Sequence, residues 1–378
     1  MMSKKVPELR FKGFTDDWEE RKFADFIDVK SGKDYKHLNS GSIPVYGTGG
    51  YMLSVDRALS DIDAIGIGRK GTIDKPYLLK APFWTVDTLF YAVPKQNIDL
   101  QFSLSIFKKI NWKKFDESTG VPSLSKTVIN SVGASVPSYE EQQKIGSFFQ
   151  QLDETIALHQ RKLDLLKEQK KGYLQKMFPK NGSKIPELRF AGFADDWEVR
   201  KLNEVSDIYD GTHQTPKYQD NGVMFLSVEN IKTLTSNKFI SREAFEDEFK
   251  IRPQRGDVLM TRIGDIGTAN VVETDEDLAY YVSLALFKSE ELNPYFLQAS
   301  IYAPFVQDQI WKRTLHIAFP KKINKNEIGQ VPINVPTLAE QTKIGSFFKQ
   351  LDKTIALHQR KLDLLKEQKK GFLQKMFV

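Results

Sequence analysis

Two long stretches of the chain carry mostly apolar residues at alternating spacings of four and three positions. The first series is Ile145, Phe149, Leu152, Ile156, His159, Leu163, Leu166, Lys170, Tyr173 and Met177. The second series is Ile344, Phe348, Leu351, Ile355, His358, Leu362, Leu365, Lys369, Phe372 and Met376. This spacing is the a/d period of a left-handed coiled coil. It predicts long helices over residues 139–179 and 338–378, each roughly 55 Å in length.

A different pattern fills the remaining stretches, where short runs of β-branched and aromatic residues are separated by Gly, Pro and Asn. Runs of this kind predict strands. The predicted strands are 42–47, 63–68, 87–93, 223–228 and 257–262, and helical patterns lie at 100–110 and 294–311. The predicted fold class is therefore mixed α/β (α+β), with two such domains joined to the pair of long helices.

The sequence is duplicated internally. Residues 141–178 and 340–377 differ at only four of 38 aligned positions, and residues 6–22 return with few changes as 185–201. We divide the chain into a short block (1–23), a first variable domain (24–138), a first long helix (139–179), a repeated short block (180–202), a second variable domain (203–337) and a second long helix (338–378). This order predicts a pseudo-dimer within one chain.

Two helices related by such a pseudo-twofold axis are expected to pair antiparallel, with His159 opposite His358. The alternative, two ordinary bundle helices inside one domain, fits less well with their length and their highly charged outer faces. In each short block, Trp18 or Trp197 is expected to bury an apolar face that joins the variable domain to the helices. The phenylalanines expected to take part are Phe11, Phe14, Phe190 and Phe193.

The two variable domains align only in fragments. DVKSG at 28–32 matches DIYDG at 207–211, and residues 65–73 match 258–266. We expect one shared scaffold whose loops differ, which is how a module changes its ligand while keeping its fold.

Composition narrows the function classes. The formal charge of +6 and the isoelectric point near 9.0 permit a polyanionic partner such as DNA. The chain has no cysteine, which excludes a thiolate nucleophile and a cysteine zinc site, and with only five histidines we expect no metal site. It also lacks the roughly 18 consecutive apolar residues of a membrane helix and the apolar core of a signal peptide. A cytoplasmic protein without membrane contact is therefore expected.

The order of short block, variable domain and long helix, present twice, closely resembles the specificity subunit of type I restriction-modification systems. The resemblance covers essentially the whole chain. The motifs that carry it are PELRF at 7–11 with Trp18, the Val-Pro and Glu-Gln-Lys-Ile junction at 136–145, GRKG at 68–71, DGTHQTP at 210–216 and the repeated long helix.

This resemblance implies two target recognition domains, each reading one half of a bipartite sequence in double-stranded DNA. It also implies an antiparallel helical spacer that sets the gap between the halves. The implied partners are two modification (methyltransferase) subunits and restriction/translocase subunits. No cofactor is expected in this chain, because S-adenosylmethionine, ATP and Mg would bind to those partners.

Candidate DNA contacts are basic, hydroxyl and amide side chains beside glycine turns, because such groups bind phosphates and base edges. In the first domain they are Lys30, Ser31, Lys33, Lys36, His37, Arg69, Lys70 and Thr72. In the second they are Thr212, His213, Gln214, Lys217, Asn230, Lys232 and Arg262. Arg69 and Arg262 are the strongest candidates, since they follow matching strands in the two copies.

Other functions find weaker support in the sequence. The stretch Asn293–Phe296 only partly matches the Asn-Pro-Pro-aromatic motif of adenine methyltransferases, and it opens a predicted helix. The glycine-rich segment 66–72 lacks the lysine that precedes the final Ser or Thr of a P-loop. The remaining alternative is a coiled-coil adaptor that binds only protein partners.

Overall fold

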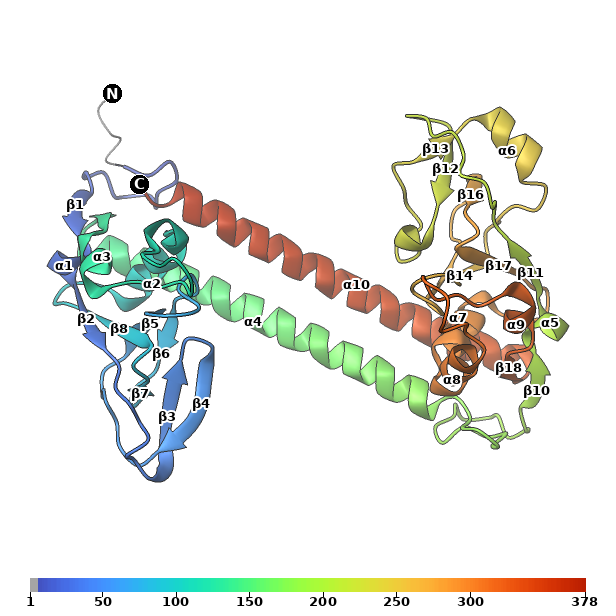
Figure 1. The fold of residues 1–378 in the computed structure, drawn as a ribbon, viewed down its shortest axis with the longest axis horizontal. Coiled ribbons are helices and arrows are strands. Elements are labelled where there is room, and N and C mark those ends of the chain that lie inside the picture. Colours follow the sequence, from blue (N-terminus) through green and yellow to red (C-terminus); the bar gives the residue numbers. More distant parts are fainter. Residues whose placement is uncertain (1–5) are drawn as a thin grey trace. The chain divides into compact units, whose positions relative to one another are not determined.

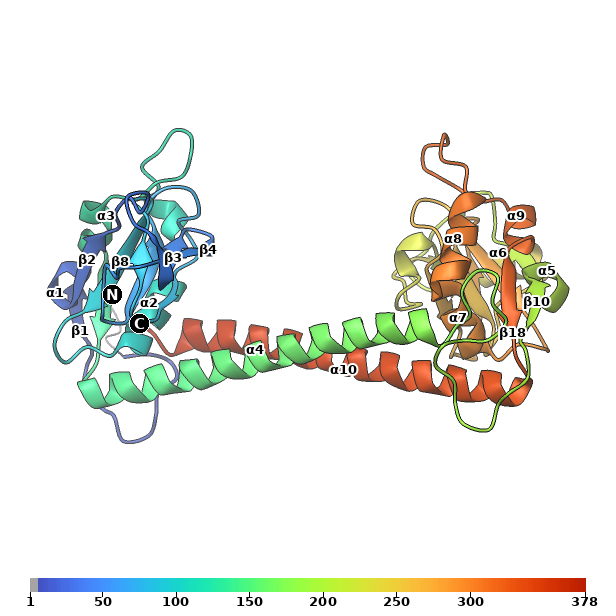
Figure 2. The ribbon, with the colours of Figure 1, turned by 90° about the horizontal axis from the view of Figure 1, so that it is seen from below.

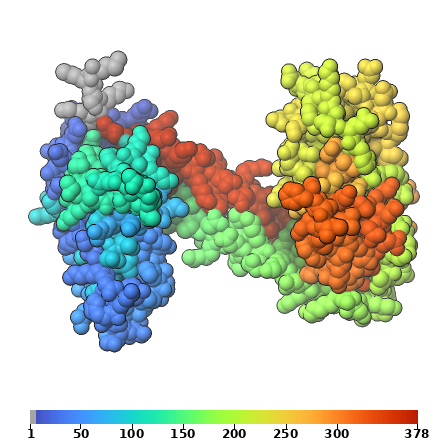
Figure 3. All heavy atoms as spheres, in the orientation of Figure 1, coloured from blue at the N-terminus to red at the C-terminus, as the bar shows by residue number. Residues whose placement is uncertain are grey.

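The computed structural model describes residues 6–378, and the chain divides into two compact units (Figure 1). The first unit comprises Met1–Arg161 with Arg360–Val378, and the second comprises Lys162–Gln359. Each unit holds one α/β domain and part of each long helix, α4 (Tyr139–Lys176) and α10 (Leu338–Lys375). In the space-filling view, each domain is a closely packed body (Figure 3).

The domain of the first unit contains two sheets and a separate strand pair. The four-stranded sheet has the order β2 (Ile27–Ser31), β8 (Leu89–Pro94), β5 (Ala64–Gly68), β6 (Tyr77–Leu79). The three-stranded sheet has the order β4 (Gly50–Val55), β3 (Ser40–Gly47), β7 (Trp84–Thr85). The strand pair consists of β1 (Glu19–Lys22) and β9 (Gly133–Val136). The helices are α1 (Phe23–Phe26), α2 (Leu100–Lys109), the 3-10 turn η1 (Trp112–Phe115) and α3 (Lys126–Ser131).

The second domain repeats this topology. Its four-stranded sheet runs β11 (Asp207–Asp210), β17 (Leu284–Lys288), β14 (Val258–Thr261), β15 (Ala269–Val271). Its three-stranded sheet runs β13 (Phe239–Ile240), β12 (Val223–Leu226), β16 (Leu278–Tyr280), and its strand pair is β10 (Glu198–Lys201) with β18 (Pro332–Val335). Its helices are α5 (Leu202–Val205), η2 (Val228–Asn230), α6 (Arg242–Glu248), α7 (Pro294–Tyr302), α8 (Pro304–Lys312) and α9 (Lys325–Gly329). The prediction of one scaffold in two copies is confirmed.

The predicted elements are present with small shifts at their ends. All five predicted strands occur, as β3, β5, β8, β12 and β14. The predicted helix at 100–110 is α2, which Asp99 caps by accepting a hydrogen bond from the Phe102 amide. The helical pattern at 294–311 forms two helices instead of one, because Ala303 precedes a proline and adopts an extended conformation.

The two long helices pair antiparallel within each unit. In the first unit the start of α4 lies against the end of α10, with the rings of Phe148 and Phe372 5.0 Å apart. In the second unit the end of α4 lies against the start of α10, with Tyr173 4.9 Å from Phe347. All twenty predicted seam positions are buried or half-buried, which confirms the heptad assignment. His159 belongs to the first unit and His358 to the second, so their opposition stays a prediction.

The lysine in the seam of each long helix forms an ion pair with an aspartate of the facing helix. In the first unit Asp153 accepts a hydrogen bond of 2.8 Å from Lys108 on α2 and a second one from Lys369 on α10. Burial acts to raise the pKa of Asp153, but these two lysines lower it overall. In the second unit the matching ion pair joins Lys170 to Asp352 at 2.6 Å. The lysine at a seam position therefore has a partner on the facing helix in each unit.

The short repeated blocks join each domain to the helices, as predicted. Trp18 packs edge-on against Phe102 of the domain and against Phe377, which follows α10. Trp197 makes the equivalent contacts with Phe296 and Phe178. Phe11 and Phe190 also pack on the helices as predicted. Phe14 and Phe193 are half-buried, as Phe11 and Phe190 are, and each lies beneath the ammonium group of a lysine on a long helix, Lys144 on α4 and Lys343 on α10.

A glycine in each long helix marks the closest approach of a domain to the coiled coil. A Cβ atom on Gly146 would lie 2.2 Å from Oδ1 of Asp99 and 2.9 Å from the Phe102 nitrogen. On Gly345 it would lie 2.4 Å from Oδ1 of Asn293. The N-terminus of α2 or α7 therefore rests directly on helix backbone.

We expect Gly146→Ala to destabilise the first unit by about 1–3 kcal/mol, the usual penalty for overpacking. Gly172→Ala is the matched control, since that glycine lies in the same helix with open space around it. There the loss of backbone freedom in the unfolded chain should make alanine stabilising by about 0.5–1 kcal/mol. Urea unfolding of the two variants should move the midpoint in opposite directions. Equal shifts would contradict the close packing at Gly146.

Candidate nucleic-acid interface

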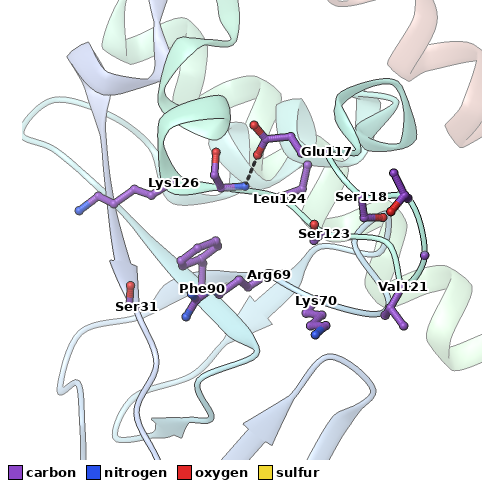
Figure 4. A pocket seen from close by; sticks show the side chains of 13 residues that line it. Ser31, Arg69, Lys70, Phe90, Glu117, Ser118, Val121, Ser123, Leu124 and Lys126 are labelled. Atoms are coloured by element: carbon purple, nitrogen blue, oxygen red, sulfur yellow. Dashed lines mark hydrogen bonds between the residues drawn. The ribbon is translucent and has the colours of Figure 1, made fainter.

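An open cavity of about 760 Å³ lies in the first domain, where β2, β5 and β8 meet the loop after η1 (Figure 4). Ser31 and Phe90 contribute from neighbouring strands, and Arg69 and Lys70 follow the end of β5. The opposite wall is formed by most of the segment 117–126, which is rich in hydroxyl groups. Cationic and hydroxyl groups around an open hollow suit phosphate oxygens and base edges.

The loop that forms this wall, residues 116–123, is fixed by its own hydrogen bonds. Oδ1 of Asp116 accepts from the amides of Ser118 and Ser123 at 3.0 and 2.9 Å, and the bond from Ser123 contributes most to lowering the pKa of Asp116. The loop is also attached to the segment after β5. There the Gly71 amide donates to the Pro122 carbonyl at 2.8 Å, and the Leu124 amide donates to Arg69 at 2.9 Å.

The second domain builds the same connection with different residues. The Gly264 amide donates to the Lys321 carbonyl at 2.8 Å, and the Ile323 amide donates to the Arg262 carbonyl at 2.9 Å. Residues 314–322 are thus the counterpart of the loop 116–123. In Figure 2 both loops project from their own domain on the side away from its long helices. The prediction that Arg69 and Arg262 hold matching positions is confirmed.

The two arginines nevertheless differ in environment. Arg69 is exposed, and its guanidinium carbon lies 5.7 Å from the centre of the Phe90 ring. The side chain of Arg262 is only 8% exposed, donates a hydrogen bond of 3.1 Å to the Ile323 carbonyl and forms an ion pair with Asp210. We therefore withdraw the assignment of Arg262 to the DNA contact.

The strand registers explain this difference. Ser31 pairs with Phe90 between β2 and β8, and at the matching place between β11 and β17 Asp210 pairs with Ala285. In the second domain a carboxylate attracts the arginine, and a small residue leaves room for its side chain. In the first domain, a hydroxyl group and a bulky ring keep Arg69 at the surface.

The other candidates of the first domain are at the surface to different degrees. Ser31 and Lys70 line the cavity with Arg69. Lys30 is exposed and lies 3.6 Å from Asp28, and Thr72 is half-buried. Exposed positions also hold the three residues of the segment between β2 and β3, namely Lys33, Lys36 and His37. These three do not line the cavity.

Two further candidates of the second domain are engaged in internal contacts. Thr212 is buried, and its hydroxyl group bonds to Glu248. Asn230 accepts from the Ser227 amide at 2.9 Å and donates to the Thr235 carbonyl at 2.8 Å, which organises its own loop. We withdraw both from the DNA contact. The four candidates that remain exposed are His213, Gln214, Lys217 and Lys232.

The two projecting loops are not among the DNA contacts predicted from the sequence. In the second loop, Ile317 and Phe319 are fully exposed, at 99% and 104%, which is unusual for such large apolar side chains. A signal was present, because residues 309–326 contain five Lys or Arg and no Asp or Glu. Such an acid-free basic run around exposed apolar residues is typical of a nucleic-acid contact.

The segment that partly matched a methyltransferase motif has a structural role. Oδ1 of Asn293 accepts hydrogen bonds from the amides of Tyr295 and Phe296, both at 3.1 Å, and so caps α7. The Asn293 amide in turn donates to Gln341 on α10 at 2.9 Å. Helix capping and attachment to the coiled coil account for this motif without a catalytic role.

Comparison with known proteins agrees with this architecture. Residues 15–168 and 194–367 each match the type I restriction modification DNA specificity domain. The chain belongs to this family. Each match includes one α/β domain and most of the long helix that follows it.

Two curated relatives come from Methanocaldococcus jannaschii. The MjaVIII specificity subunit of a type I restriction enzyme is 24% identical over 332 residues, which cover 83% of this chain and 75% of the relative. A putative MjaX specificity subunit is 24% identical over 286 residues, covering 71% and 63% respectively.

Solved structures share the fold. The S subunit of a type I restriction-modification system from M. genitalium matches with a TM-score of 0.74 and 14% identity, covering 99% of each chain. A second solved structure, which addresses complex assembly and conformational transition of the type I R-M system, contains a chain that matches with a TM-score of 0.53 and 16% identity. The match covers 95% of this chain and 97% of that chain. Across the described residues 6–378, none of the helices has the length and apolar character needed to span a membrane.

Proposed function

We propose that this chain selects the DNA target of a type I restriction-modification complex. Each α/β domain contacts one half of a bipartite sequence in double-stranded DNA, and the antiparallel helix pair sets the gap between the halves. The observation that carries this proposal is a scaffold repeated in full while its candidate contact loops differ. Ser31 and Phe90 correspond to Asp210 and Ala285, and the loop 116–123 corresponds to the unlike loop 314–322.

The duplicated frame supports a duplicated partner. The near-identical helices and short blocks offer the same surface twice, so we propose that two modification subunits bind in pseudo-symmetric fashion and that restriction/translocase subunits join them. Methylation and cleavage then belong to these partners, which would bind S-adenosylmethionine, ATP and Mg. In this proposal the chain itself is non-catalytic and acts in the cytoplasm, where the DNA lies.

Sequencing of methylated sites tests the proposal directly. The chain is co-expressed with its modification subunits, and the methylated sites of the host genome are mapped. A two-part sequence with a fixed gap is expected. Exchange of residues 203–337 for the equivalent domain of a relative should then change one half of the target and leave the other half intact. A change in both halves would contradict separate recognition.

The alternative is an adaptor that binds only protein partners. The assembled complex should bind duplex DNA in a mobility-shift assay, with an affinity that falls steeply as salt rises, because bound lysines and arginines release counterions from phosphates. An adaptor would show no such binding at any salt concentration.

Arg69→Ala tests the cavity of the first domain. If Arg69 reads a guanine edge, its loss should remove about 1–3 kcal/mol of discrimination and relax one position in one half-site only. If it binds a phosphate, all targets should weaken alike and the salt dependence should flatten by about one unit of slope. Mapping of methylated sites separates the two outcomes, and unchanged DNA binding would remove Arg69 from the interface.

Arg262→Ala is the matched comparison, since it alters the equivalent position. Its loss leaves Asp210 without the guanidinium that neutralises it. We expect a lower unfolding midpoint, with the sequence of the second half-site retained in protein that remains folded.

A further inference from the structure

The tip of the loop 314–322 differs from the rest of the second domain in exposing large apolar side chains completely. Ile317 and Phe319 are 99% and 104% exposed, whereas Leu315 at the base of the same loop is 39% exposed. Exposed apolar surface is unfavourable in water by roughly 25 cal/mol per Å². Two such residues at one tip therefore favour contact with a partner.

The base of this loop is held firmly. The Leu315 amide donates to the Lys322 carbonyl at 2.7 Å, and the Thr314 hydroxyl group donates to the Ile310 carbonyl at 2.9 Å. The ring of His316 lies 4.2 Å from that of Trp311, whose other neighbour is the Lys321 ammonium group at 4.7 Å. The tip is thus presented on an ordered support, which lowers the entropy lost on binding.

Charge indicates the kind of partner. The stretch 309–326 carries Lys312, Arg313, Lys321, Lys322 and Lys325 and has no acidic residue. Apolar tips flanked by cations on both sides match a DNA duplex, which offers stacked bases between two rows of phosphates. The loop is also bonded to the segment after β14, the counterpart of the segment that lines the cavity of the first domain.

We propose that Phe319, with Ile317 beside it, inserts as an apolar wedge between adjacent base pairs of the half-site bound by the second domain. Lys321 and Lys322 contact the flanking phosphates. Insertion unstacks one base step and kinks the duplex, so easily kinked steps are favoured at that place. The counterpart loop of the first domain carries Gly120 and the smaller Val121 at its tip, so the distortion is confined to one half-site.

This inference rests on the proposed function, and its test uses the complex with modification subunits on a duplex that carries the mapped target. Donor and acceptor dyes at the two DNA ends report bending. We expect Phe319→Ala to weaken binding by about 5- to 150-fold, the range for loss of one aromatic stacking contact, and to reduce the bend. A single mismatch at the wedged step should tighten binding of the native complex, since that step is then already unstacked, and should help the variant much less.

The control is Val199→Ala, which also shortens an exposed apolar side chain of the second unit, 54% exposed on β10. It should leave affinity and bending unchanged. If the Phe319→Ala complex binds and bends DNA as the native complex does, the wedge is overturned and the proposed function stands. A Phe319→Ala variant that loses modification subunits while the remaining complex bends DNA normally would also overturn the wedge, in favour of a protein contact. If the native complex binds no DNA, the proposed function fails and the wedge fails with it.

Discussion

Replacement of Arg10 by alanine is expected to destabilise the first unit by about 3–5 kcal/mol, because it leaves a buried carboxylate without its partner. Arg10 donates two hydrogen bonds to Glu141, from Nε at 2.7 Å and from Nη2 at 2.8 Å, and a third to the Asp16 carbonyl. The side chain of Glu141 is only 1% exposed. The hydrogen bond with Glu141 is the main cause that raises the pKa of Arg10.

Chemical unfolding of single and double variants separates the ion pair from simple packing. Replacement of both Arg10 and Glu141 by methionine should recover most of the stability, because no unpaired charge then remains buried. Lys80→Ala is the surface control, since its pair with Asp63 leaves the lysine side chain 68% exposed and should contribute less than about 1 kcal/mol. If Arg10→Ala behaved like Lys80→Ala, the short block would not be fixed to the helix by this pair.

The second copy offers an internal replicate. Arg189 binds Glu340 with the same two bonds, at 2.7 and 2.8 Å, and Glu340 is likewise 1% exposed. Arg189→Ala should therefore destabilise the second unit to a similar extent. If each variant lowers the unfolding midpoint of its own unit and leaves that of the other unit unchanged, the two domains unfold independently.

Regular elements could be predicted from the sequence because their periods follow directly from side-chain burial. The seam of the coiled coil is readable over ten positions in each copy, and the strands are short runs bounded by turn residues. The break between α7 and α8 is also a local effect of Pro304, although the helical pattern continues across it.

The site was harder to predict because its details depend on contacts between distant residues. Arg69 and Arg262 align in sequence, yet their environments are decided by Ser31 and Asp210, which lie on another strand. The alignment of DVKSG with DIYDG already contained that difference, but only the strand register brings it next to the arginine. The projecting loops have no periodic pattern, so only their charge distribution could have marked them.

The largest change of function is expected from a change in helix length. We predict that deletion of one heptad from each long helix, residues 156–162 and 355–361, shortens the gap between half-sites by about three base pairs, because seven helical residues span about 10 Å. The two segments have the same sequence and hold corresponding places in α4 and α10. A whole heptad preserves the a/d seam, so the helices should still pair.

Mapping of methylated sites measures the gap in the native and shortened chains. Both half-sequences should persist, because the domains and their cavity residues are untouched. Deletion of two residues from each helix is the control: at about 100° per residue it turns the following apolar positions by about 200°, onto the charged face, and should abolish pairing instead of moving the half-sites. A shortened chain that folds and methylates a changed half-sequence with the original gap would refute spacing by the helix pair. Retention of both half-sequences with a shorter gap would assign target selection to the domains and spacing to the coiled coil.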